Sequence, residues 1–129
     1  MHYDLIFCDD IRLEASGQHT LVGVYQEGVN AEEFPVIGKF SCWLRIHGLS
    51  KGKHKIDFSL SFPAPDGSPS GYEIEFEIID GNLPSAVALG PLYVKVSEAK
   101  PIEAILIIDD NDPITIGKLG VSLAAQPQT

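Results

Sequence analysis

Asp9 and Asp10 follow a cysteine and a short apolar run, and no other stretch of the sequence looks more like an active site. Two carboxyl groups held close together can share one proton, because like charges do not both ionise, and such a pair can act as an acid and a base. Adjacent residues on a strand point to opposite faces, so these two carboxylates are expected to diverge. The sequence favours a strand end, where an aspartate caps turn amides and Arg12 supplies a local partner.

A second acidic cluster, "DDNDP" at residues 109–113, supplies Asp109, Asp110 and Asp112. Carboxylates are the oxygen ligands that calcium prefers, but calcium binds about six to eight oxygens, which must come from more than this loop. Aspartate, asparagine and proline between two strands are also ordinary turn residues. We expect a turn here, and the three aspartates are the weak metal candidates of the sequence.

The other reactive residues form no catalytic or cofactor motif. They are four histidines and two cysteines: His2, His19, His47, His54, Cys8 and Cys42. No two histidines have the spacing of a zinc site, and neither cysteine lies in a Cys-x-x-Cys. The nucleophile motif Gly-x-Ser-x-Gly and the glycine-rich phosphate loop are absent as well. We expect no cofactor and no metal, and the sequence assigns no catalytic residue.

Apolar and polar residues alternate along several segments, which is the period-two pattern of half-buried strands. The pattern is clearest at residues 53–62 and 71–80, which flank a stretch rich in proline and glycine and therefore predict a hairpin. Other strands are predicted at the start of the chain and at 19–26, 37–47, 91–97, 102–109 and 114–123. About eight strands separated by turn residues predict an all-β fold: a single antiparallel β-sandwich, broadly immunoglobulin-like, in one domain over residues 1–129.

The alternation in residues 37–47 predicts that one face is buried, formed by Phe40, Cys42, Leu44 and Ile46. Trp43 then lies on the outer face, with Lys39 and Arg45 as neighbours. Tryptophan and arginine often anchor interfaces, so these three residues are candidates for binding a partner. The alternative is that another segment folds over Trp43, or that its ring packs on the stems of the two basic side chains.

The strand at 71–80 places three glutamates on its polar face: Glu73, Glu75 and Glu77. We expect this ladder on the same outer surface as Trp43. Like charges along one face repel each other, so lysine or arginine from adjacent strands should offset them, with Lys53, Lys55 and Arg45 as the nearest candidates.

The composition is that of an ordinary folded domain, with 44% apolar and 21% charged residues in 129. Nine basic residues against 18 acidic ones give a formal charge of −9, which repels phosphate backbones and anionic lipid. We therefore expect neither nucleic acid nor membrane as a partner. The start of the chain does not resemble a secretory signal, and reduced thiols at both cysteines are the default without export, so we expect a cytoplasmic protein.

Three stretches together resemble a known pattern: "FCDDIR" at 7–12, "TLVGVY" at 20–25 and "FPVIGKF" at 34–40, with Gly17 between the first two. They are similar to an uncharacterised family of small bacterial all-β proteins, whose members begin with C-D-D-[IV]-R, a glycine turn and an L-[IV]-G-V-Y strand. The resemblance implies a bacterial all-β domain and no assigned activity. It also suggests a structural corner, in which Asp9, Asp10 and Arg12 tie the turn and Gly17 takes a backbone conformation barred to other residues.

The sequence therefore favours a binding or structural module that acts on a protein partner or a second copy through one sheet face or the loops at one end. The alternative is a hydrolase or metal-dependent enzyme with a site assembled from loops around Asp9, Asp10 and residues 109–112. An enzyme of that kind needs these acids to converge in one pocket, whereas a binding module leaves them at separate turns.

Overall fold

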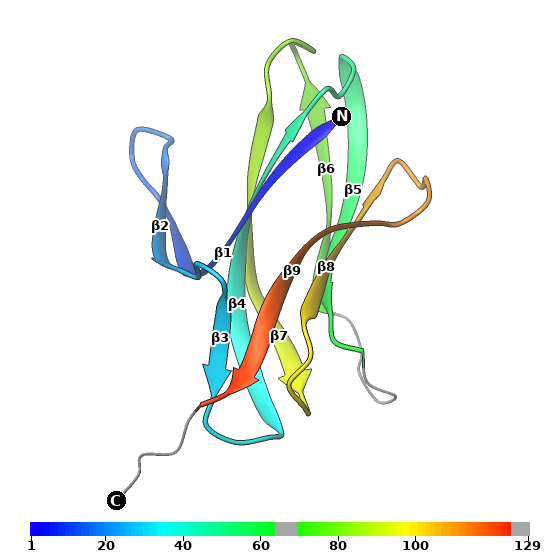
Figure 1. Ribbon diagram of the computed structural model, residues 1–129. Coiled ribbons are helices and arrows are strands. Elements are labelled where there is room, and N and C mark those ends of the chain that lie inside the picture. The colour runs from blue at the N-terminus through cyan, green and yellow to red at the C-terminus, as the bar shows by residue number, and fades with distance from the viewer. Residues whose placement is uncertain (64–69, 125–129) are drawn as a thin grey trace, which may run out of the picture.

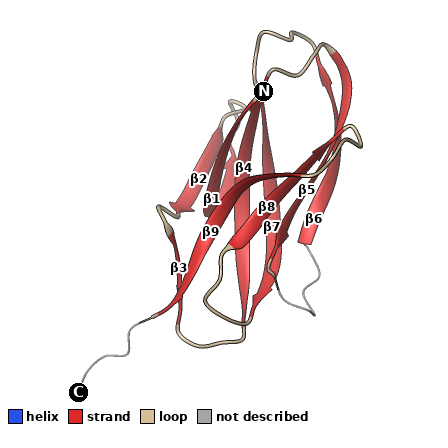
Figure 2. Cartoon of the chain, turned by 45° about the vertical axis from the view of Figure 1, so that its right-hand side comes forward, coloured by secondary structure: helices blue, strands red, loops and turns tan. Residues whose placement is uncertain are grey.

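The computed structural model describes residues 1–63 and 70–124, which form strands, turns and loops and contain no helix (Figures 1 and 2). The strands are β1 (His2–Leu13), β2 (His19–Val24), β3 (Gly28–Ala31), β4 (Val36–His47), β5 (Gly52–Ser61), β6 (Ser70–Ile78), β7 (Ser85–Val96), β8 (Ile102–Ile108) and β9 (Ile114–Leu123). The prediction of an all-β chain is confirmed. In the described ranges there is no helix with the length and apolar character to cross a membrane.

The strands form two sheets, which differ from the predicted arrangement in two ways. The first sheet has the order β2-β1-β4-β7 and the second the order β3-β9-β8-β5-β6. The prediction of about eight strands missed β3, which has four residues and lies after the chain crosses between the sheets. It also missed that β3 pairs parallel with β9, whereas the other paired strands are antiparallel.

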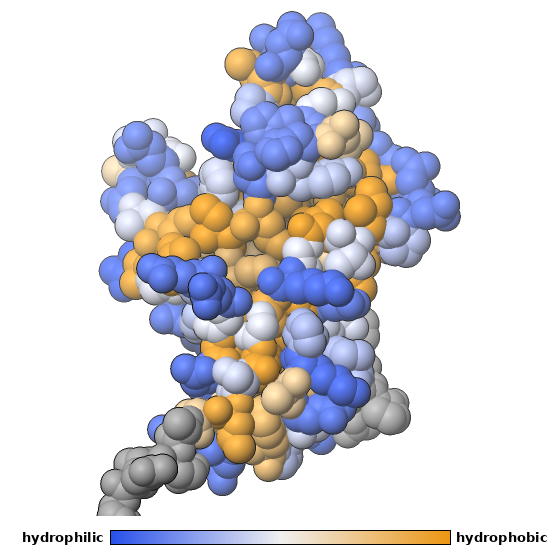
Figure 3. All heavy atoms as spheres, viewed as in Figure 1, coloured by the Kyte–Doolittle hydropathy of each residue, from blue (hydrophilic) through white to orange (hydrophobic). Residues whose placement is uncertain are grey.

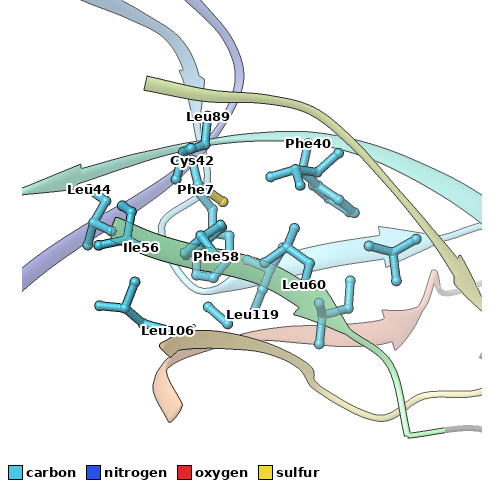
Figure 4. Close-up of a cluster of buried hydrophobic side chains, with 14 of the residues drawn as sticks. Phe7, Phe40, Cys42, Leu44, Ile56, Phe58, Leu60, Leu89, Leu106 and Leu119 are labelled. Carbon is cyan, nitrogen blue, oxygen red and sulfur yellow. The ribbon is translucent and has the colours of Figure 1, made fainter. Parts of the chain in front are cut away.

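The core lies between the two sheets and follows the alternation of the sequence. Phe40, Cys42, Leu44 and Ile46 are each at most 3% exposed, which confirms the predicted register of β4. They meet apolar side chains of the second sheet, among which Phe58 of β5 is central (Figure 4). At one edge the sheets approach closely, because a Cβ on Gly117 of β9 would lie 2.8 Å from a methyl carbon of Leu5.

Two strands are longer than predicted, each for a physical reason. Strand β1 does not end at Asp9 but continues to Leu13, because its second half pairs with β2 after its first half has paired with β4. Strand β7 begins at Ser85, ahead of the glycine and proline at 90 and 91. Proline lacks the N–H that a central strand needs, but β7 is an edge strand, and its register with β4 shifts at this point.

The predicted hairpin of residues 53–62 and 71–80 is confirmed, since β5 and β6 pair antiparallel along their length. Residues 64–69 of the connecting stretch lie outside the described residues. Lys53 faces Glu77 and Lys55 faces Glu75 across this pair, as expected for a ladder offset by lysines. The expectation that Arg45 and Trp43 share this surface is wrong, because β4 belongs to the other sheet.

Phe58 gives a direct test of the core. We predict that Phe58→Ala lowers the free energy of unfolding by about 3 to 5 kcal/mol, since it removes a ring that is 1% exposed and leaves a cavity between the sheets. Lys53→Ala, at an exposed position of the same strand, should change it by less than about 0.5 kcal/mol. Urea unfolding followed by tryptophan fluorescence measures both, and equal losses would contradict the assigned core.

Candidate functional site

The pairing of β1 with β4 places three pairs of side chains on the outer face of the first sheet. His2 faces His47, Asp4 faces Arg45, and Ile6 faces Trp43. Partners that lie opposite each other in a sheet point to the same side, and the intervening pairs, such as Leu5 with Leu44, point into the core. We call this set of six residues the outer strip: His2, Asp4, Ile6, Trp43, Arg45 and His47.

Asp4 is the electrostatic centre of the outer strip. Its Oδ2 lies 2.9 Å from His47 Nε2 and accepts a hydrogen bond from Arg45 Nε at 3.0 Å, while its Oδ1 lies 2.8 Å from His2 Nε2. The hydrogen bond with His47, followed by those with His2 and Arg45, holds the pKa of the Asp4 carboxyl well below its ordinary value. The carboxylate therefore stays charged and ties together three residues from two strands.

Trp43 is half-buried because a neighbouring hairpin reaches it. Its indole Nε1 donates a hydrogen bond of 3.1 Å to Nδ1 of His19, and the Arg45 guanidinium carbon lies 5.4 Å from its ring centre. His19 belongs to the hairpin formed by the second half of β1 and by β2, residues 8–24, which we call the arm. The arm projects from the body in Figure 1 and stands apart from it in Figure 3. As the alternative expected, another segment reaches Trp43 through His19. Of the two basic side chains, Arg45 lies over its ring.

A surface cleft of about 860 Å³ opens beside the outer strip, and we call it the edge cleft. It is lined by consecutive residues of three segments: 3–7 of β1, 24–27 of the crossover between the sheets, and 116–119 of β9, together with Trp43 and Arg45. Successive side chains of a strand point to opposite faces, so odd and even positions line the same cavity only when the cavity lies beside the edge of the strand. Hydrophobic residues cover much of the middle of the face shown in Figure 3.

The strand edges at this cleft lack partners in the described residues. β1 pairs with β4 on one side over residues 2–8, but β2 covers its other side only from Cys8 onward. β9 likewise pairs with β8, and β3 covers its other side only from Gly120. Residues 2–6 of β1 and 114–119 of β9 therefore present unpaired backbone groups at this edge.

Lys39, the third candidate for partner binding, lies on β4 away from the other two. It is exposed and lines two smaller cavities, and neither of them includes Trp43 or Arg45. Lys39 therefore does not line the cavities that contain Trp43.

Asp9 and Asp10 lie where β1 passes from β4 to the arm. The Asp9 carboxylate accepts a hydrogen bond from the Tyr25 hydroxyl, and burial together with this contact raises the pKa of Tyr25 to about 12. Asp10 accepts a hydrogen bond of 3.4 Å from Arg12 Nε. Gly17, at the tip of the arm, has a φ of +89°. The expectation that Arg12 supplies a local partner is confirmed at Asp10, while the Asp9 carboxylate contacts the Tyr25 hydroxyl where turn amides were expected.

Asp109 and Asp110 form the turn between β8 and β9. Both have positive φ angles, 50° and 59°, and Asn111 N donates to Ile108 O at 2.9 Å, which is the geometry of a type I′ hairpin turn. Asp110 pairs with Lys55 Nζ at 2.9 Å. Asp112 follows as an exposed residue, so the three aspartates are arranged around a turn.

His54 is held between two acceptors beside this turn. Its Nδ1 lies 2.6 Å from Asp109 Oδ2 and its Nε2 lies 2.7 Å from the Ser50 carbonyl oxygen, and the side chain is only 10% exposed. Both contacts favour the doubly protonated ring, and the bond to Asp109 is the main reason that the pKa of His54 is raised. The pKa of Asp109 is lowered, chiefly by the N–H of Lys55 and then by His54.

The predicted acids do not meet. Asp9 and Asp10 line a cavity of about 280 Å³ in the first sheet, whereas Asp109 lines a separate one of about 490 Å³ over β5 and β6. The residues that the structure does bring together, His2, Asp4 and His47, were not singled out as a group. The available signals were two period-two patterns, H-x-D at 2–4 and W-x-R-x-H at 43–47, but only the register of β1 on β4 unites them.

Comparison with known proteins places the chain in a family. A family model described as "Family of unknown function (DUF6941)" matches residues 4–111. The chain belongs to this family. No curated protein matches it. The expectation of an uncharacterised family is therefore confirmed, while its bacterial origin and its exact sequence pattern stay predictions. The DUF6941 match includes Asp4, Trp43, Arg45 and His47 but neither His2 nor β9.

In this DUF6941 chain, the raised pKa of His54 predicts that stability depends on pH. A raised folded pKa means that the stabilisation is complete below the unfolded value of 6.5 and disappears as pH rises through the folded value. Because the pKa of Asp109 is lowered, its ionised form stabilises the fold above the ordinary pKa of 3.8, and this stabilisation is lost as pH falls below that value. We predict that the stability difference between the protein and His54→Gln is large at pH 5.5 and small at pH 9. Urea midpoints at the two pH values measure it, and a constant difference would contradict the charged clamp.

The close approach of Asp9 to β2 predicts a second effect. Gly23 of β2 has a φ of +69°, and a Cβ there would collide with the Asp9 carboxylate. Gly17 has a similar positive φ, but a Cβ there would meet nothing within 4 Å. Gly17→Ala should therefore cost about 1 kcal/mol from backbone strain alone, and Gly23→Ala should cost more. Thermal unfolding of the two variants compares them, and equal losses would show that Asp9 does not confine this position.

Proposed function

We propose that this protein is a non-enzymatic binding module, which captures an extended segment of a partner protein at the edge cleft. The architecture that we propose for it is a sandwich, broadly immunoglobulin-like, with one open edge. The observation that carries the proposal is the edge of β1 at residues 2–6, which faces a cleft and has no paired strand among residues 1–63 and 70–124.

An extended peptide fits this cleft because of its backbone. Tyr25 N donates to Phe7 O at 2.9 Å, so the backbone groups of Phe7 point away from β4 toward the β2 side. The backbone groups of Tyr3 and Leu5 share that direction, because alternate residues of a strand bond to the same side. A peptide that runs along β1 would satisfy these groups and extend the first sheet, which is a common mode of peptide recognition.

Side chains beside this edge supply the contacts that distinguish one peptide from another. Trp43 and Arg45 line the edge cleft and are stacked on each other, and such residues often dominate binding energies. Lys118 and Glu27 line the cleft as well, so both signs of charge are present. Lys39 lies apart from this surface, and we leave it out of the proposed contact.

The overall charge supports a partner other than a second copy of the chain. Each chain carries a formal charge of −9, so two copies repel each other before any contact forms. A basic segment of another protein is attracted instead, and a neutral one is not repelled. Nucleic acid and anionic membranes are disfavoured by the same charge. The two buried free thiols, Cys8 and Cys42, support a reducing compartment such as the cytoplasm.

The enzyme alternative receives less support from the site geometry. A hydrolase or metal-dependent enzyme built on the predicted acids would need them in one cavity, and Asp9 and Asp10 line a different cavity from Asp109. Asp9 is engaged by Tyr25, and Asp109 by His54 and Lys55. Each of these carboxylates already has a structural partner, which supports binding over acid–base catalysis by this set.

The test uses a display library of random twelve-residue peptides, selected on the full chain. We predict that selected peptides bind with an affinity that Trp43→Ala weakens by at least about fivefold, which corresponds to about 1 kcal/mol. Tyr93→Ala removes an exposed aromatic ring elsewhere on β7 and should change the affinity by less than twofold. Fluorescence anisotropy of labelled peptides measures all three affinities.

Nuclear magnetic resonance then locates the bound peptide. The amide signals of residues 3–7 and 116–119 should shift on binding, because the peptide lies between these edges. Peptides whose binding ignores Trp43 and shifts residues elsewhere, or a library that yields no binder, would overturn the proposal. If Trp43→Ala no longer unfolds cooperatively, the affinity is measured with Arg45→Gln instead, and the same loss of affinity is expected.

A further inference from the structure

The outer strip contains a group of three side chains, two of which lie outside the edge cleft. His2 and Asp4 are two residues apart on β1, and His47 faces His2 from β4. One ligand atom from each, a ring nitrogen of either histidine and a carboxylate oxygen of Asp4, lies within 4.8 Å of the other two. In sequence the two histidines are far apart, so spacing along the chain did not reveal them as a pair.

Two imidazole nitrogens and one carboxylate oxygen on one face are a recurrent ligand set for transition metals. Bonds from zinc to such atoms measure about 2.0 to 2.2 Å, so ligand atoms around one ion lie about 3 to 4 Å apart. The two histidine nitrogens already lie 2.8 and 2.9 Å from the oxygens of Asp4. Small side-chain rotations would therefore suffice to turn the three ligand atoms toward one ion.

We propose that His2, Asp4 and His47 form a binding site for one divalent transition-metal ion of the zinc type, with water completing the coordination on the solvent side. The site goes beyond the proposed peptide binding, since neither histidine lines the edge cleft. Imidazole and carboxylate together favour zinc, cobalt and nickel over calcium and magnesium, which prefer oxygen ligands alone.

The surroundings of the three ligands suit a preformed site. All three stand on strands that pair in register; the side chains of Asp4 and His47 are 31% and 35% exposed, and that of His2, on the solvent side, is 68% exposed. The imidazole rings lie close, with centres 5.1 Å apart. The contacts of both rings with Asp4 use Nε2 and so do not occupy Nδ1.

Arg45 has two opposing effects on a bound ion. Its Nε donates to Asp4 Oδ2 at 3.0 Å, which orients the carboxylate in the way that partners behind a metal ligand commonly do. Its positive charge also repels a dication at short range. We therefore expect the site to bind an ion with moderate affinity, and the experiment works at micromolar concentrations.

The experiment uses the untagged full chain, freed of metal with a chelator, and titrates it with Zn²⁺ in a calorimeter. We expect one Zn²⁺ per chain, and at least about tenfold weaker binding for His47→Gln and for Asp4→Asn, since each removes a ligand. His54→Gln is the matched control, because His54 also contacts an aspartate but lies in the other sheet, and it should change the affinity by less than twofold.

Co²⁺ provides a readout of the ligands themselves. Visible absorption bands of the bound ion should appear with the unmodified chain and fade for His2→Gln and His47→Gln. Circular dichroism of each variant establishes that it is folded. Trp43→Ala should bind Zn²⁺ within twofold of the unmodified chain, so that failure of peptide binding and failure of metal binding are separate results.

Three outcomes would overturn the metal site. The first is absence of Zn²⁺ binding at about 100 µM, a concentration far above the dissociation constants of established zinc sites. The other two are equal weakening by His54→Gln and binding that survives both His47→Gln and Asp4→Asn. The last two would assign the ion to scattered surface groups.

Discussion

The change of pairing partner along β1 is the constraint on which the rest of the structure depends. Residues 2–8 pair with β4, and residues 8–13 pair with β2, so Cys8 is the point where one strand serves two neighbours. The second half leaves the body with β2 as the arm, and no strand of the described part of the chain pairs with the other side of the first half. The outer strip, the edge cleft and the contact of His19 with Trp43 all follow from this switch.

Charge on this face is organised by the same geometry. Asp4 stands between two histidines and Arg45, so a carboxylate, two imidazoles and a guanidinium occupy neighbouring positions in an otherwise acidic protein. On the second sheet, His54 and Asp109 show a comparable pairing, but there both nitrogens of the ring are engaged and the unit ties a turn to β5. The first arrangement leaves ring nitrogens near solvent and suits a ligand, whereas the second suits stability.

The sequence predicts side-chain direction and the β5–β6 hairpin well, but it does not predict the pairing of distant strands. Alternation in β4 correctly separates Phe40 and Cys42 from Trp43, because the two faces of a strand depend only on local spacing. It misses β3, which is too short to show a pattern, and the first half of β7, where Pro91 conceals an edge strand. The grouping of His2 with His47 depends on the register of β1 on β4, a contact between distant segments that no local pattern encodes.

The uncovered edge of β1 can be tested most directly by amide hydrogen exchange, measured residue by residue in the free protein. The N–H groups of Asp4 and Ile6 point toward β4 and are expected to exchange slowly, while those of Tyr3 and Leu5 point to the open side and are expected to exchange much faster. Slow exchange at all four amides would mean that this edge is covered, and it would contradict the account of β1 as an open strand.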